Sequence, residues 1–327
     1  MKNILLAVVM LAMALGSCRR KETPPVPDQP ESPSVSVPVF NSDSAYAFMA
    51  AQTAFGPRVP GSKAHEACAL WMESQLKRYC DNVTVQPFVA RSWDKRLLNG
   101  KNIIASFNPD ARKRILLCAH WDSRPYADHD PNPANHRKPI DGANDGASGV
   151  GALIEVARLL SQNPLQHGVD IIFFDLEDLG EPQQEQSDLS DTWCLGSQHW
   201  SKTPHITGYR AAFGILLDMV GAPDATFFME GTSMHYAPEI MQKVWNTAHQ
   251  IGYGNYFIKT ESNPITDDHL YINKLAGIPT IDIIHIDPST PTGFFKYWHT
   301  VNDRLENIDK NTLKAVGQTV TQVIYSY

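Results

Sequence analysis

Apolar and polar residues alternate along the chain in blocks that predict buried strands and amphipathic helices in turn. The best-defined strand covers 170–176, where two isoleucines and two phenylalanines follow one another without a polar residue between them. A continuous apolar run of this length is typical of a strand buried on both faces, as in a parallel sheet. The same criterion predicts further strands at 83–85, 102–105, 114–120, 213–217 and 280–285.

Helical periodicity fills the segments between these strands. Ser42 and Ser62 are placed to cap two helices near the start of the folded region, the first of which is expected to run to Phe55. Further helices are predicted after Gly149, over 238–251 and at the C-terminal end, and 266–269 begins a short one. Alternating helices and buried strands predict an α/β fold: a single globular domain with a mostly parallel central sheet flanked by helices.

Side chains that can bind metals or transfer protons follow four of the predicted strands. They are His120 with Asp122, Glu177 with Asp178, Asp218, and His285. Ligands of open α/β sheets bind beyond the carboxyl ends of the strands, so we expect these side chains to converge on one site. Carboxylates in a partly dry site are costly without a cation or a proton. Since no neighbour in the sequence neutralises Glu177 and Asp178, we expect a metal ion, with one acid left for proton transfer.

Asp145, Asp178 and His299 would give a zinc ion three protein ligands and an open fourth position, the arrangement of a catalytic zinc site. Taken singly, each assignment has an ordinary alternative. Asp145 lies in a turn rich in Gly, Ala and Ser, where it could simply cap the following helix. A lone histidine is more often a structural residue. Together with the acids at the strand ends, however, the three residues favour a metal site.

The N-terminal segment predicts export. Lys2 precedes an apolar run from Ile4 to Leu15 that is too short to span a membrane, and Gly16, Ser17 and Cys18 follow. This ending resembles a bacterial lipobox, in which the cysteine is lipidated; an ordinary signal peptide is the alternative. The chain then divides into a lipoprotein-type signal peptide (1–17), a lipidated Cys18 with a tether containing six prolines (18–40), and a catalytic domain (41–327). We expect a periplasmic or cell-envelope lipoprotein of a Gram-negative-type bacterium that meets the membrane only through its lipid.

Composition adds little to this interpretation. A hydrophobic fraction of 43% is sufficient for a sizeable core, and a net charge of −7 without a basic cluster argues against nucleic-acid binding. Four cysteines remain after the signal peptide, and the sequence does not choose among their three possible disulfide connectivities. Cys118, inside an apolar strand, is expected to be a buried thiol. His129, His136 and His167 lie in polar segments and are expected at the surface.

Five motifs carry a resemblance to a known family. They are His120–Asp122, Asn144–Gly149, Phe174–Asp178, Leu217–Gly221 and Trp298–Thr300. Their order resembles that in zinc aminopeptidases of the M28 type and in the related type II glutaminyl cyclases, and the resemblance covers about residues 42–327. Three features resemble the cyclase branch: Asp267 before the Asp268–His269 pair, Trp298 with Phe294 upstream, and the Leu217–Pro223 segment.

The resemblance to the cyclases implies a bacterial acyltransferase that converts the N-terminal Gln of peptides and proteins to pyroglutamate and releases ammonia. It implies one zinc ion per chain on Asp145, Asp178 and His299, a proton carrier at Glu177, and hydrogen-bonded carboxylates at Asp218 and Asp267. It also implies a substrate pocket walled by Trp298, Phe294 and Trp193, with Trp200 as the rival to Trp193, and a monomeric enzyme.

The sequence departs from the family pattern at Asp178, where animal cyclases have a glutamate, so a small backbone shift is needed to keep the distance to the metal. It also leaves two alternatives open. A two-zinc aminopeptidase would use His120 and Asp218 as additional ligands, with Glu177 activating a bridging water. A tethered module that binds peptide or glycan would not catalyse a reaction at all.

Overall fold

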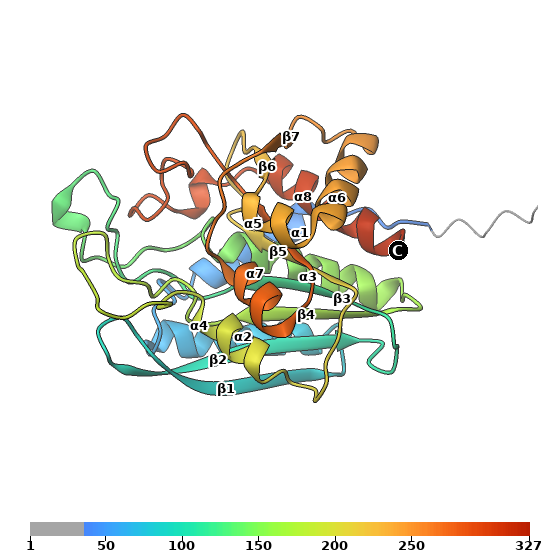
Figure 1. Cartoon of the computed structure of the whole chain (residues 1–327), viewed down its shortest axis with the longest axis horizontal. Coiled ribbons are helices and arrows are strands. Elements are labelled where there is room, and N and C mark those ends of the chain that lie inside the picture. The colour runs from blue at the N-terminus through green and yellow to red at the C-terminus, as the bar shows by residue number, and fades with distance from the viewer. Residues whose placement is uncertain (1–35) are drawn as a thin grey trace, which may run out of the picture. The chain divides into compact units, whose positions relative to one another are not determined.

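Six strands form the central sheet of the computed structural model, which describes residues 36–327 (Figure 1). The predicted signal peptide and most of the predicted tether lie outside the described residues. The strand order is β1-β2-β4-β3-β5-β8. Strands β4, β3, β5 and β8 run parallel, whereas β2 is antiparallel to both β1 and β4. The prediction of a mostly parallel sheet in one α/β domain is therefore confirmed, with an antiparallel hairpin at one edge.

The strands are β1 (Val83–Arg91), β2 (Leu97–Phe107), β3 (Arg114–His120), β4 (Gly168–Phe174), β5 (Phe213–Asp218), β6 (Phe227–Met229), β7 (Phe257–Glu261) and β8 (Thr280–Ile284). The α-helices are α1 (Ser42–Thr53), α2 (Lys63–Lys77), α3 (Ala147–Gln162), α4 (Leu195–Lys202), α5 (Gly231–Tyr236), α6 (Pro238–Gln250), α7 (Asp268–Tyr271) and α8 (Lys310–Tyr325). Short 3-10 helices cover Pro133–Asn135 and Leu305–Asn307, and α7 continues into a π-helical turn, Ile272–Ala276.

Alternate residues of each central strand enter cores on opposite faces of the sheet, as the period of a strand requires. On β3, Ile115 and Leu117 join the larger core, to which helices α1, α2, α3, α6 and α8 contribute. Leu116 and Cys118 join the smaller core, together with Trp200 of α4. Burial on both faces explains why these strands are continuous apolar runs in the sequence.

Some predicted elements were shorter or longer than the observed ones. The strands predicted at 83–85 and 102–105 are parts of the long hairpin β1–β2, and the first helix ends at Thr53. The small parallel pair β6–β7 and helix α5 were not predicted. Cys118 is buried as expected, and all four cysteines of the described segment are free thiols. Within residues 36–327 no helix has the length and apolar character needed to cross a membrane.

Candidate active site

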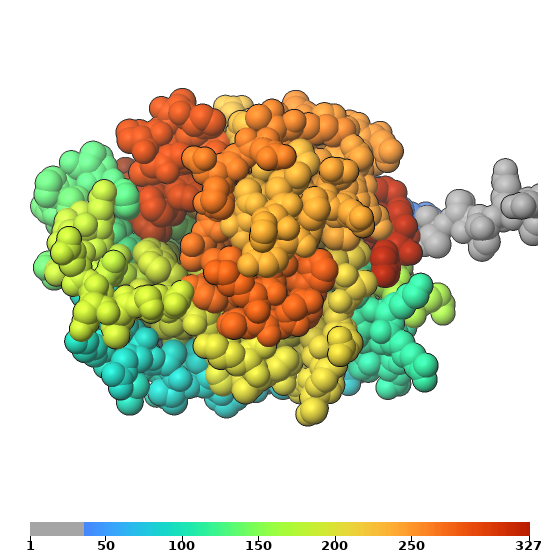
Figure 2. Space-filling model, in the orientation of Figure 1, coloured from blue at the N-terminus to red at the C-terminus, as the bar shows by residue number. Residues whose placement is uncertain are grey.

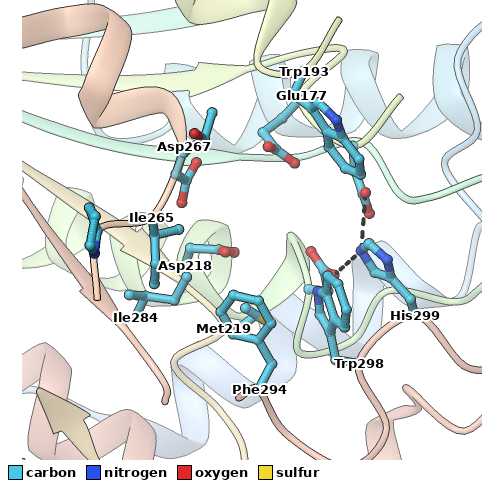
Figure 3. A pocket seen from close by; sticks show the side chains of 14 residues that line it. Glu177, Trp193, Asp218, Met219, Ile265, Asp267, Ile284, Phe294, Trp298 and His299 are labelled. Atoms are coloured by element: carbon cyan, nitrogen blue, oxygen red, sulfur yellow. Dashed lines mark ion pairs between the residues drawn. The ribbon is translucent and has the colours of Figure 1, made fainter. Parts of the chain in front are cut away.

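A cavity of about 350 Å³ lies at the carboxyl ends of the central strands, enclosed by the segments that follow β3, β4, β5, β7 and β8 (Figure 3). The structure brings all nine predicted site residues together here. The cavity is lined by Asp145, Glu177, Asp178, Trp193, Asp218, Met219, Pro264, Ile265, Thr266, Asp267, Ile284, Phe294, Trp298 and His299. Three of the residues expected at the strand ends do not line the cavity: His120 contacts Asp145 and Asp218, Asp122 accepts the N–H groups of Glu177 and Asp178, and His285 is buried elsewhere, facing Phe227 and Phe295. Ile284, the last residue of β8, lines the cavity in place of His285.

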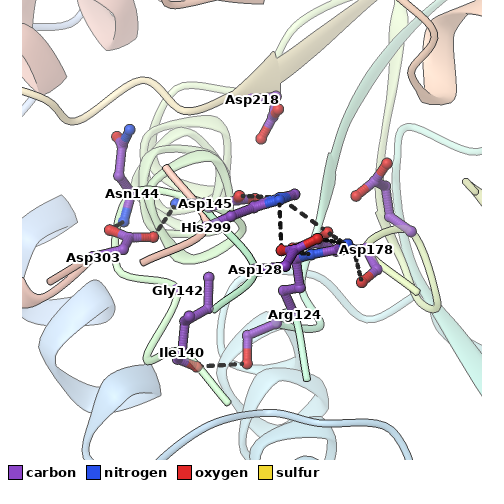
Figure 4. Close-up of polar contacts among 12 residues, drawn as sticks. Arg124, Asp128, Ile140, Gly142, Asn144, Asp145, Asp178, Asp218, His299 and Asp303 are labelled. Carbon is purple, nitrogen blue, oxygen red and sulfur yellow. Dashed lines mark hydrogen bonds and ion pairs between the residues drawn. The ribbon is translucent and has the colours of Figure 1, made fainter. Parts of the chain in front are cut away.

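Asp145, Asp178 and His299 form one buried group of potential metal ligands (Figure 4). Their ligand atoms all lie within 4.8 Å of one another, and Nε2 of His299 is 3.4 Å from Asp145 Oδ2 and 3.2 Å from Asp178 Oδ1. Oδ2 of both aspartates has no hydrogen-bond partner although it is buried. One carboxylate oxygen of each aspartate and an imidazole nitrogen lie close enough to share a zinc ion with three protein ligands, and the unpaired oxygens fit such an ion. Asp145 is not the helix cap considered above, since Gly146 occupies the N-cap of α3.

Neighbouring side chains hold these three ligands in place. Nδ1 of His299 lies 3.5 Å from Asp128 Oδ1, which leaves Nε2 to face the metal position. Arg124 binds Asp128 through two nitrogens, at 2.7 and 2.6 Å, and also approaches Asp178 at 3.3 Å. The carboxylate of Asp303 accepts hydrogen bonds from the backbone N–H groups of Asn144 and Asp145 at 2.8 and 3.0 Å. These supporting roles of Asp128 and Asp303 were missed in the sequence, where only their position in polar loops was visible.

A tight turn after β4 presents the acid pair. Leu176 has φ of 58°, a left-handed conformation that is unfavourable for leucine and typical of functional sites. The carboxylate of Asp122 holds this turn, accepting the N–H of Glu177 at 3.0 Å and that of Asp178 at 3.2 Å. The turn brings the short side chain of Asp178 to its metal-facing position. No sequence neighbour neutralises Asp178, but two residues that are distant in the chain, Arg124 and His299, approach its carboxylate.

Glu177, Asp218 and Asp267 form a second group of acids beside the metal ligands (Figure 3). Glu177 and Asp267 each have a carboxylate oxygen within 4.8 Å of the other, and the Cys194 thiol donates to Glu177 Oε1 at 3.2 Å. Burial raises the pKa of Glu177 well above its usual value; nearby His120 opposes this effect, and the charges of Asp267 and Asp178 add to it. Burial likewise raises the pKa of Asp218 to about 7. Acids shifted in this direction can take up and release protons near neutral pH.

Two further acids lie behind Asp267. Asp268 and Asp282 are fully buried, and neither carboxylate has a hydrogen-bond partner among the described residues. Burial and the charge of Asp267 raise the pKa of both residues well above the usual value, which favours the protonated form of each. Asp282 was missed in the sequence, although a single acid within the apolar strand 280–285 was a usable signal.

Aromatic rings form the remaining wall. The ring centroid of Trp298 lies 4.8 Å from that of Phe294 and 3.7 Å from that of His299. Trp193 lines the cavity parallel to His299, whereas its rival Trp200 is fully buried in the smaller core. His129 was wrongly expected at the surface: it is half-buried, and its ring centroid is 4.4 Å from that of Trp298. The polar segments 124–144 and 180–191 gather with 285–300 at one end of the molecule (Figure 2).

A second group of potential metal ligands shares Asp145 with the first. His120, Asp145 and Asp218 are all buried, with Nε2 of His120 3.0 Å from Asp145 Oδ1 and 3.2 Å from Asp218 Oδ1. Burial alone would lower the pKa of His120, but Asp122, Asp145 and Asp218 raise it well above its usual value. The geometry therefore accommodates either a histidinium bridging two aspartates or a second metal ion.

Comparisons with known proteins show similarity to peptidase family M28 and to glutaminyl cyclases. The profile of peptidase family M28 matches residues 102–324. A Zn-dependent exopeptidase from Parabacteroides distasonis and a glutaminyl cyclase from Bacteroides thetaiotaomicron, the latter bound to N-acetylhistamine, are each 53% identical, with TM-scores of 0.88. Each match covers 89% of this chain and 100% of the solved chain.

Among curated sequences, a glutaminyl-peptide cyclotransferase from Boiga irregularis is 27% identical over 254 residues, which cover 69% of this chain. This chain spans about 65% of the length of that relative.

Proposed function

The chain belongs to peptidase family M28, and we propose that it is a zinc-dependent glutaminyl-peptide cyclotransferase. Such an enzyme closes an N-terminal Gln of a peptide or protein to pyroglutamate and releases ammonia. One observation carries the proposal: a three-ligand metal set lies beside a separate group of acids in a cavity with aromatic walls. The similarity to solved bacterial glutaminyl cyclases supports the same activity.

The reaction needs little from the enzyme beyond orientation and proton transfer. The nucleophile, the α-amine, belongs to the same residue as the γ-amide that it attacks, so no water has to be activated. A zinc ion held by Asp145, Asp178 and His299 supplies a Lewis acid for the γ-carbonyl. Glu177 accepts one proton from the attacking amine and donates one to the leaving amide nitrogen, which departs as ammonia.

The remaining cavity residues have supporting roles in this proposal. Asp218 and Asp267 lie next to Glu177 and bind the departing amide by hydrogen bonds, which the raised pKa of Asp218 favours. Trp298, Phe294 and Trp193 pack against the glutamine stem and exclude water. At about 350 Å³ the cavity is at the small end of the range for ligand sites, as suits one residue rather than a long peptide segment.

A paired-substrate assay tests the activity. We expect the purified enzyme to release ammonia from Gln-initiated peptides and to leave Leu-initiated amides almost uncleaved. The two-zinc aminopeptidase remains the second candidate, because His120, Asp145 and Asp218 also form a potential metal set. The opposite substrate preference, together with two zinc ions per chain by elemental analysis, would establish the aminopeptidase. One zinc ion per chain supports the cyclotransferase, and no turnover of either substrate would leave the binding-module alternative.

Export and lipidation of the chain are part of the same proposal. A lipid on Cys18 would hold the enzyme at the cell envelope. We expect the enzyme to be a monomer and its partners to be peptides that start with Gln. We expect membrane fractionation to recover the protein with the membranes and Cys18→Ala to release it into the soluble fraction. If the wild type and Cys18→Ala were distributed equally between the membrane and soluble fractions, an ordinary signal peptide would be supported. Light scattering of the protein lacking the anchor tests the monomer.

A further inference from the structure

A second cavity, of about 650 Å³, adjoins the first. The two cavities share Pro264, Ile265 and Phe294 in their walls. Beyond these residues the second cavity continues as a groove past Phe228 and Ile286. In Figure 3, Ile265 lies beside Asp267 and away from His299, so this part of the shared wall lies across the active site from His299.

The walls of this groove are held by hydrogen bonds. Glu230 Oε1 accepts the N–H of Ile265 at 2.6 Å, and the hydroxyl of Thr232 donates to the Ile265 carbonyl at 2.9 Å. On the facing wall, the Thr290 hydroxyl donates to the Phe294 carbonyl at 2.7 Å. The groove is therefore preformed, and a ligand bound there does not have to order these segments first.

The chemistry of the groove differs from that of the active site. Phe228, Ile265, Ile286 and Phe294 are partly exposed and give it an apolar floor. Its single charged residue is Glu261, which is exposed. Such a surface fits apolar side chains together with one cationic group.

A peptide whose first residue lies in the active site must leave that small cavity through its next residues, because the carboxyl carbon of the first residue is bonded to the second. We propose that this groove binds residues two to four of the substrate peptide, with apolar side chains against Phe228 and Ile286 and a Lys or Arg near Glu261. This inference rests on the proposed cyclotransferase activity. It identifies the preferred substrate class as Gln-initiated chains with apolar second and third residues followed by a basic residue.

The test compares three substrates: glutaminamide, which has no second residue, and two tetrapeptide amides, Gln-Leu-Phe-Lys and Gln-Gly-Gly-Gly. We expect the wild-type enzyme to prefer the apolar tetrapeptide over the glycine tetrapeptide by about tenfold in kcat/KM. Ile286→Ser should abolish most of this preference and leave glutaminamide turnover as in the wild type. Leu275→Ser is the matched control, since Leu275 is an exposed apolar residue outside both cavities, and it should keep the preference.

The charge of Glu261 provides an independent test of the proposal. Glu261→Lys should lower kcat/KM for Gln-Leu-Phe-Lys and raise it for Gln-Leu-Phe-Glu, and added salt should diminish both effects. No response to the charge of the fourth residue, together with an unchanged apolar preference in Ile286→Ser, would overturn the proposal. An equal loss on glutaminamide would overturn it as well, because the groove residues would then act on the first cavity.

Two further measurements separate this inference from its premise. Absence of ammonia release from glutaminamide would contradict the proposed cyclotransferase activity. Turnover of glutaminamide without any tetrapeptide preference would contradict only the proposed peptide binding in the groove. Affinity of the labelled tetrapeptide for a Glu177→Gln enzyme gives a readout without turnover, and it should fall about tenfold on adding Ile286→Ser. If that substitution instead changes only self-association in sedimentation, the groove is a contact between copies of the chain and the proposal is wrong.

Discussion

At the scale of single residues, the site depends on giving neighbouring acids different tasks. Glu177 and Asp178 are adjacent in the chain, but Asp178 faces Arg124 and His299 while Glu177 faces Asp267 and the Cys194 thiol. Burial raises the pKa of Asp178, but the positive charges of His299 and Arg124 oppose this shift and favour the ionised form that the proposed metal ion requires. Burial raises the pKa of Glu177 well above its usual value, and the charges of Asp267 and Asp178 add to the shift, as the proposed proton carrier requires.

The clearest residue-scale prediction concerns Glu177. Replacing it with glutamine keeps the size of the side chain but removes proton transfer, so we expect kcat to fall by about 10²–10⁴-fold. Circular dichroism and zinc content should stay as in the wild type. Glu185→Gln is the control, because Glu185 is partly exposed and contacts only Arg137 among the charged groups of the described chain. Near-normal ammonia release by the Glu177 variant would exclude this residue from proton transfer.

A second residue-scale prediction concerns Gly180, which lies against Trp193. A Cβ on Gly180 would be 1.7 Å from Cε2 of Trp193, so any side chain there must displace the ring. We expect Gly180→Ala to raise KM for Gln-initiated peptides several-fold and to change the Trp193 fluorescence. Thermal stability should change little, because Trp193 lies at the cavity wall rather than in the core. An unaltered KM would mean that Trp193 does not contact the substrate.

At the scale of elements, short helices and turns position the acids. Glu230 caps α5 by accepting the N–H groups of Thr232 and Ser233, each at 2.7 Å, and it also contacts His269 Nε2 at 3.0 Å. Through Ile265 the same carboxylate holds the segment that leads to Asp267. One buried glutamate thus ties α5 to the start of α7.

This cap predicts a pH dependence of stability. Burial alone would raise the pKa of Glu230, but hydrogen bonds from His269, Ser233 and Thr232 outweigh it and lower the pKa to about 2, from 4.5 in an unfolded chain. Because the folded state holds the ionised form more tightly, the stabilisation is complete above pH 4.5 and is lost as the pH falls towards 2. The shift corresponds to about 3 kcal/mol.

Urea unfolding of the wild type and of Glu230→Gln measures this contribution. The difference in unfolding free energy between them should be largest near neutral pH and should shrink by about half at pH 3. Asp43→Asn, at an exposed site on α1, is the control and should show no comparable change. A difference that does not vary between neutral and acidic pH would contradict the cap assignment.

At the scale of the whole molecule, the proposed metal ligands come from distant parts of the chain. Asp145 precedes α3, Asp178 follows β4, and His299 lies in the loop before α8. A ligand that binds only the folded state stabilises it by mass action, so a zinc ion shared by these segments would stabilise the entire domain.

We therefore expect chelation to abolish activity and to lower Tm by about 5 °C or more, and added zinc to restore both. Asp145→Asn should already have the lower Tm and should respond little to the chelator. Differential scanning calorimetry with matched ammonia assays makes this measurement. A purified enzyme that contains no metal and keeps its Tm and activity in chelator would refute the zinc assignment.

How far the sequence alone predicted the fold depends on the element. Buried parallel strands leave continuous apolar runs, so β3, β4, β5 and β8 were located to within a few residues. The hairpin β1–β2 was underestimated because its exposed edge residues interrupt the apolar pattern. The pair β6–β7 was missed because strands this short carry almost no periodic signal.

For the site, the sequence by itself determined which residue types stand at the ends of the strands, because parallel strands must finish at one edge of the sheet. Only the tertiary structure decided which of these side chains meet. It placed His285 outside the cavity, put Trp193 rather than Trp200 in the wall, and paired His299 with Asp128. Such contacts join residues that are far apart in the chain, and they depend on loop geometry and left-handed turns at Leu176 and His299, which no local pattern of side chains encodes.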